Sequence, residues 1–128
     1  MPVRFDDALG THAQALVLRS KRAQVLAANL VNADTPNYLA RDLDFPAALA
    51  QSGGSMPLSV THAAHVQGGS GSGAELLYRI PTQPAADGNT VDPHQEKAQF
   101  MQNALRYEAS LEFLDARIKG LMAAIRGE

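Results

Sequence analysis

The chain has 128 residues, a formal net charge of −2 and an isoelectric point near 6.0. A chain of this length builds one hydrophobic core, and because aromatic residues make up only 5% of it, we expect that core to be thin. The nearly balanced charge argues against a nucleic-acid or anionic-membrane role, since both need a surplus of basic residues. Cysteine is absent, which excludes thiolate metal sites, disulfides and cysteine nucleophiles.

The beginning of the chain does not resemble a cleaved secretory signal. It contains Asp6, Asp7 and His12 and has no apolar run. No stretch of the sequence approaches the roughly 18–20 apolar residues that cross a membrane. If this protein leaves the cytoplasm, we expect it to be exported without a cleaved signal peptide.

An N-terminal helix is predicted within residues 1–31. From Phe5 to Val31 there is no proline, and Gly10 is the one glycine. Alternating steps of four and three residues select a narrow line of small and aliphatic side chains, which suits the close approach of another helix. This N-terminal seam consists of Leu9, Ala13, Leu16, Ala23, Ala27 and Leu30, with Ser20 as its polar position.

A C-terminal helix is predicted within residues 92–128. Asp92 suits the N-cap, Pro93 the first helical position and Gly127 the end of the helix. The same steps of four and three select an apolar line along its whole length. This C-terminal seam consists of Phe100, Ala104, Tyr107, Leu111, Leu114, Ile118, Leu121 and Ile125.

The middle segment, residues 32–91, is rich in loop signals. Its glycine-rich run at 68–73 has the composition of a linker. Alternating apolar residues at 56–60 and 76–80 indicate a small β-hairpin around that run.

The predicted fold is therefore mainly α, with two long terminal helices packed as a coiled-coil pair around a loop-rich middle. Alanine occupies many seam positions and contributes little buried area, so one helix pair of this kind is only marginally stable. We expect both seams to need neighbouring protein.

No pattern in the chain points to catalysis. His62 and His65 form an H-x-x-H pair without a third ligand, and solvated or locally hydrogen-bonded imidazoles are the expectation there. Asp42 and Asp44 are expected to pair with Arg41 or another neighbour rather than to form a catalytic dyad. Since no nucleophile, phosphate-loop or zinc-protease motif occurs, we predict a protein that is not an enzyme and has no metal or cofactor.

The segment that ends the first predicted helix reads ANLVNADTPNY, residues 28–38. Pro36 prevents the helix from continuing, and Asn37 tolerates a left-handed turn. The sequence of this segment resembles the A-N-x-x-N-A-x-T-P-G-Y signature of the flagellar basal-body rod and hook family, with asparagine in place of glycine. The signature positions are Asn29, Asn32, Ala33, Thr35, Pro36, Asn37 and Tyr38.

Further segments resemble the proximal-rod members of that family: ARDLDF at 40–45, DGNTVD at 87–92, NALRYEASL at 103–111 and IKGL at 118–121. The resemblance implies a subunit that is exported unfolded through the flagellar type III apparatus and assembles helically into the rod. It also implies that the terminal helices line the inner tube, where they form part of the export channel wall, and that the rod transmits torque for motility.

The partners that the resemblance implies are other copies of the chain, other rod proteins, and the MS-ring, adaptor and export-gate proteins at the rod base. Nucleic acid, a small-molecule substrate and a direct membrane span are not expected. On the residues alone, the alternative is a soluble helical adaptor or regulatory module that binds a partner helix through the C-terminal seam.

Overall fold

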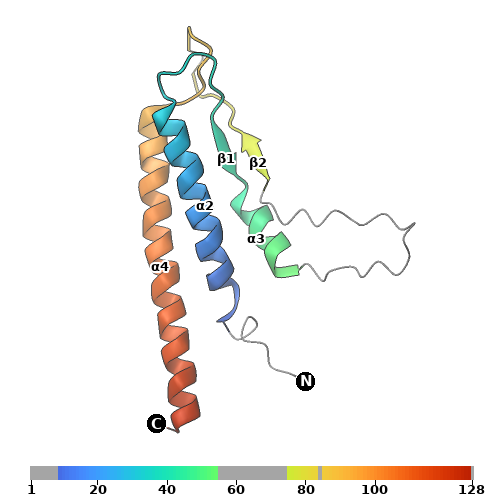
Figure 1. Cartoon of the computed structure of the whole chain (residues 1–128), viewed down its shortest axis with the longest axis vertical. Coiled ribbons are helices and arrows are strands. Elements are labelled where there is room, and N and C mark those ends of the chain that lie inside the picture. The colour runs from blue at the N-terminus through green and yellow to red at the C-terminus, as the bar shows by residue number, and fades with distance from the viewer. Residues whose placement is uncertain (1–8, 55–74, 84, 128) are drawn as a thin grey trace, which may run out of the picture.

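The computed structural model describes residues 9–54, 75–83 and 85–127. Two long helices lie side by side, and a two-stranded sheet with a short helix covers the other side of the first one (Figure 1). In chain order the elements are α2 (Thr11–Val31), β1 (Arg41–Leu43), α3 (Phe45–Gly54), β2 (Leu76–Tyr78) and α4 (Pro93–Arg126). The predicted mainly α fold, with a long helix near each end, is confirmed.

The ends of α4 are where local sequence signals place them. The Asp92 carboxylate accepts hydrogen bonds from the backbone N–H groups of His94 at 2.9 Å and Gln95 at 3.3 Å, and Pro93 follows it. Gly127 takes a left-handed conformation with φ of 77°, and its N–H donates to the Ala123 carbonyl. Both predicted caps of α4 are confirmed.

The start of the first helix differs from the prediction. Gly10 has φ of 67°, a left-handed conformation that interrupts helical geometry, and α2 begins at Thr11. A continuous helix from Phe5 to Val31 is therefore wrong, because it would have to pass through Gly10; residues 1–8 lie outside the described part.

The sheet joins segments on either side of the middle of the chain. β1 pairs antiparallel with β2, with Asp42 opposite Leu77. The strand predicted at 76–80 exists at 76–78, and its partner in the described sheet is β1. The other predicted strand, at 56–60, lies outside the described residues. Residues 55–74, which include His62, His65 and the glycine-rich run, lie outside the described part.

The short helix α3 was not predicted. Asp44 begins it: its carboxylate accepts from the Ala47 N–H at 3.2 Å, and its carbonyl accepts from the Ala48 N–H at 2.9 Å. Pro46 needs no amide partner in this first turn. α3 lies against α2 and completes a small hydrophobic cluster, which consists of Leu18, Leu43 and Ala48 with Phe45 and Leu49 packed against them.

In the described ranges, no helix has both the length and the apolar character needed to cross a bilayer.

Candidate functional site

The signature turn after α2 is held by a segment more than fifty residues further along the chain. The side-chain nitrogen of Asn89 lies within hydrogen-bond distance of three carbonyls in the turn after α2, those of Asn32 at 3.0 Å, Ala33 at 2.7 Å and Thr35 at 2.9 Å. Its Oδ1 accepts from the N–H of Val91 at 2.8 Å. Asn89 is buried, so this one side chain docks the 87–92 segment onto the signature.

The turn itself is closed by short-range bonds and by one left-handed residue, Asn37. The Asn32 amide donates to the Ala28 carbonyl at 2.8 Å, and the Thr35 hydroxyl donates to Asn32 Oδ1 at 3.2 Å. Asn37 has φ of 60°, which confirms the predicted left-handed turn. Gly88 packs against it so closely that a Cβ there would lie 2.6 Å from Asn37 Oδ1.

Beyond the turn, the chain continues beside the same segment. The N–H of Asn37 donates to the Asp87 carbonyl, and the Thr90 N–H donates to the Tyr38 carbonyl. The Thr90 hydroxyl then accepts from the Ala40 N–H at 2.7 Å. The signature and the DGNTVD segment, which sequence resemblance singled out separately, thus form one junction; its Pro36 is exposed.

Asn29 ties this junction to both long helices. It is fully buried, and its amide donates to the Arg41 carbonyl at 2.7 Å and to Glu96 Oε2 at 3.1 Å. Its Oδ1 accepts from the Arg41 N–H at 3.1 Å. One side chain on α2 therefore holds the edge of β1 and a carboxylate of α4.

A charge network lies beside Asn29. Arg22 binds Asp42 in a two-pronged ion pair, with both N···O distances at 2.8 Å. Arg79 binds the same carboxylate at 2.7 Å and also pairs with Glu96. Asp42 was expected to pair with Arg41 or another neighbour, and its partners are Arg22 and Arg79. Arg41, on the neighbouring position, points to the other side of the strand and lies over the Tyr78 ring.

Two cations and two anions balance in this network, but their environments differ. Burial raises the pKa of Glu96 above its ordinary value, and the Asn29 and Arg79 contacts only partly oppose this effect. Burial also opposes ionisation of Asp42, but hydrogen bonds from Arg22 and Arg79 outweigh it and leave the pKa of that carboxyl lowered. The Asp42 hydrogen bond in turn raises the pKa of Arg22.

The described residues show no arrangement suited to metal-assisted chemistry. They contain no group of three or more histidine, aspartate or glutamate side chains that could hold a metal ion. Asp42 is held in the charge network and Asp44 caps α3, so both members of the sequence's carboxylate pair have structural contacts.

The most buried residues of α4 are polar and do not belong to its apolar seam. Glu96, Asn103 and Ser110 recur every seven residues and are buried, with exposures of 0%, 2% and 7%. In the C-terminal seam, Leu114 is half-buried and the other seven residues are exposed, among them Ile118 at 39% and Ile125 at 85%. All six residues of the N-terminal seam are half-buried.

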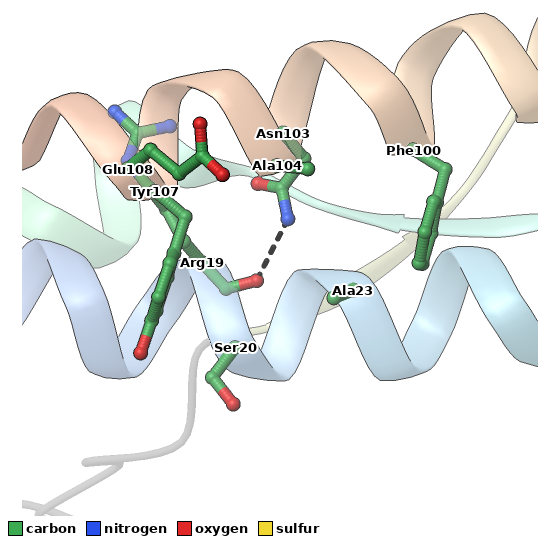
Figure 2. Close-up of a pocket in the computed structure, with 8 residues that line it drawn as sticks. All are labelled: Arg19, Ser20, Ala23, Phe100, Asn103, Ala104, Tyr107 and Glu108. Atoms are coloured by element: carbon green, nitrogen blue, oxygen red, sulfur yellow. Dashed lines mark hydrogen bonds between the residues drawn. The ribbon is translucent and has the colours of Figure 1, made fainter.

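The two seams meet at the border of one groove. Ser20 and Ala23 of α2 lie across from Phe100, Ala104 and Tyr107 of α4, as Figure 2 shows, and the space between them is about 280 Å³. The groove thus brings together residues that the sequence assigned to both seams, on the outside of the helix pair. Tyr107 lines it, as a packing residue would.

Curated relatives match the chain over almost its whole length. It is 51% identical over 125 residues to "Flagellar basal body rod protein FlgB" of Cereibacter sphaeroides, covering 97% of this chain and 98% of the relative. Proteins of the same name in Aeromonas hydrophila and Escherichia coli are 46% and 43% identical, with at least 96% of each chain covered. The chain belongs to the FlgB family of flagellar basal body rod proteins. No protein-family model matches it.

Membership of the FlgB family confirms the resemblance that the signature segments carried. The signature segments do not include Arg22, Arg79 or Glu96, and the sequence did not predict a role for these three residues. The two arginines lie 57 residues apart and have no pattern in common. Glu96, Asn103 and Ser110 do carry a signal, because they recur every seven residues. An apolar line with the same period lies on the same helix, and such a line is normally the buried one.

Proposed function

We propose that this chain is a structural subunit of the proximal rod of a bacterial flagellum and is required for flagellum-dependent motility. In this proposal, copies assemble helically with other rod proteins, transmit torque and form part of the wall of the export channel. The observation that carries it is the open apolar surface of α4, on a chain whose nearly full-length relatives are named as rod proteins.

The C-terminal seam is proposed as a contact surface between subunits. A single exposed apolar side chain needs no explanation, but a continuous line along one helix marks an interaction surface. Six of its eight residues are large hydrophobics exposed by more than a third. The groove beside Phe100 and Tyr107, where Ser20, Ala23 and Ala104 are small, offers room for side chains of a neighbouring helix.

We propose that the chain lies at the rod base, where its partners are other copies of the chain, other rod proteins, and the MS-ring, adaptor and export-gate proteins. In this proposal it reaches that position by type III export, without a cleaved signal peptide. The rod-signature junction is proposed to hold α2 and α4 in the relative position that this packing needs. Asn29 and Asn89 are the two side chains that make the most of those contacts.

The proposal is tested by placing a charge on the seam without touching the chain's own interior. Ile118→Asp is expected to abolish rod assembly and swimming in a flagellated strain whose own FlgB gene is deleted, because burying an unpaired carboxylate between subunits is costly. Ala116→Asp is the matched control, since Ala116 is exposed on the opposite side of α4. Normal swimming with Ile118→Asp would contradict the proposal.

A further inference from the structure

α4 carries two adjacent lines of side chains, one polar and one apolar, and either line could pack against α2. The polar ladder, Glu96, Asn103 and Ser110, lies against α2. The C-terminal seam runs beside it: at about 100° per residue, Tyr107 lies roughly 40° and Ala104 roughly 100° around the helix from Asn103. A turn of α4 by about 70°, the mean of those two angles, would bring the seam against α2 in place of the ladder.

Apolar burial alone favours the turned arrangement. It would remove large hydrophobic side chains such as Tyr107 and Leu111 from water, whereas the observed one leaves them exposed. The observed arrangement also leaves Asn103 Oδ1 and Arg19 Nε buried without a hydrogen-bond partner in the described residues. A helix pair selected only for its own stability would not combine an exposed seam with orphaned polar atoms.

Specific bonds hold α4 in the observed rotation. The Asn103 amide donates to the Arg19 carbonyl at 2.9 Å, a contact that Figure 2 marks across the two helices. Glu96 binds Asn29 of α2 and Arg79 next to β2. Ser110 donates to the Arg106 carbonyl of its own helix, so its hydroxyl is satisfied while its small side chain sits at the interface.

Turning α4 would break the ladder's contacts together. Glu96 would move away from Arg79 and Asn29, and Asn103 would move away from the Arg19 carbonyl, which leaves buried polar and charged groups unpaired. Polar residues at single buried coiled-coil positions set register in this way, at a cost in stability.

We infer that the polar ladder fixes the rotation of α4 on α2 and thereby keeps the C-terminal seam facing outward, free for neighbouring subunits. The rotation is a property of the isolated chain. Only the use of the outward seam rests on the proposed function.

The test uses the absence of cysteine from the sequence. A single cysteine is introduced by Leu111→Cys, in the half-exposed seam, and its rate of reaction with a maleimide is measured on the purified monomer at low concentration. The same measurement is repeated in a chain that also carries Asn103→Leu and Ser110→Leu. Ala109→Cys, exposed and on the opposite side of α4, is the matched control.

The ladder substitutions are expected to slow labelling at position 111 at least tenfold, because the seam turns inward, and to leave labelling at position 109 unchanged. Far-UV circular dichroism establishes that the variant is helical. If the double variant does not fold, Asn103→Leu alone is used, with at least a threefold slowing expected. An unchanged rate at position 111 in a folded variant overturns the inference.

The two proposals fail in different experiments. If labelling slows and the ladder variant still swims, the rotation is right and the seam's part in rod assembly is wrong. If labelling is unchanged while Ile118→Asp abolishes swimming, the seam is an assembly surface but the ladder does not control it.

Discussion

The end of the molecule around Asn29 and the C-terminal half of α4 are built in opposite ways. Around Asn29, hydrogen bonds and ion pairs join α2, β1, α4 and the residue after β2, and nearly every polar atom has a partner inside the chain. The C-terminal half of α4 has large exposed hydrophobics and an exposed ion pair between Asp115 and Lys119 at 2.7 Å. The chain uses polar contacts within its own fold and leaves large apolar side chains of α4 exposed.

The lengths of the helices agree with this division. α4 has 34 residues and α2 has 21, and Figure 1 shows the red end of α4 continuing past the start of α2. Substitutions near Asn29 should therefore lower the stability of the isolated chain, whereas substitutions on the C-terminal seam should affect assembly and leave that stability nearly unchanged.

The largest loss of stability is expected for Asn29→Ala. It removes three hydrogen bonds and leaves Glu96 and both backbone groups of Arg41 short of a partner, so we expect a loss of about 3 kcal/mol in the free energy of unfolding. Urea unfolding followed by circular dichroism measures it. Gln24→Ala, at an exposed position of the same helix, should cost less than about 0.5 kcal/mol; a similar small cost for Asn29→Ala would show that the junction does not stabilise the fold.

A smaller, pH-dependent loss is expected for Asp42→Asn. Removing the charge that two arginines share should cost about 2 kcal/mol at pH 7. Because the folded-state pKa of Asp42 is lowered from 3.8, this contribution is fully present above that pH and disappears as the pH falls through the folded-state value. Unfolding of both proteins between pH 7 and pH 3 measures the difference, and a constant difference over that range would contradict the assignment.

Gly88→Ala is expected to cost about 1–2 kcal/mol, since alanine is strained at a φ of 74° and its Cβ would meet Asn37. The thermal unfolding midpoint of the purified chain measures the loss. Gly120→Ala is a control glycine substitution: no atom lies within 4 Å of the added Cβ, and in a helix alanine should be neutral or stabilising.

The smallest effect is expected for Asn37→Gly. Glycine adopts the left-handed conformation freely and keeps the backbone bond to Asp87, so the change should alter stability by less than about 1 kcal/mol, without loss of rod assembly. A clear loss of swimming would show that the Asn37 side chain itself is used, beyond its place in the turn.

What the sequence could predict was local. The caps of α4 depend on Asp92, Pro93 and Gly127 alone, and the left-handed turn at Asn37 depends on its own residue type. The start of α2 was missed because one glycine in a helical pattern is often tolerated, and the positive φ that breaks the helix at Gly10 is not visible in the pattern.

What could not be predicted depends on residues far apart in the chain. β2 pairs with β1 across more than thirty residues, and Asp42 finds its partners at positions 22 and 79. The apolar period of α4 identified an apolar line but not what lies against it, because periodicity does not distinguish a face buried within the chain from an exposed one. The structure separates them: the polar ladder is buried against α2, whereas seven of the eight seam residues are exposed.

The most direct test of this account is the reactivity of one seam cysteine before and after assembly. Ile118→Cys, in a chain that keeps motility, is labelled with a maleimide in the purified monomer and in isolated basal bodies. We expect fast labelling in the monomer, where Ile118 is exposed, and labelling at least tenfold slower in basal bodies, where neighbouring subunits cover it. Equal rates in the two states would contradict the claim that the C-terminal seam is an assembly surface.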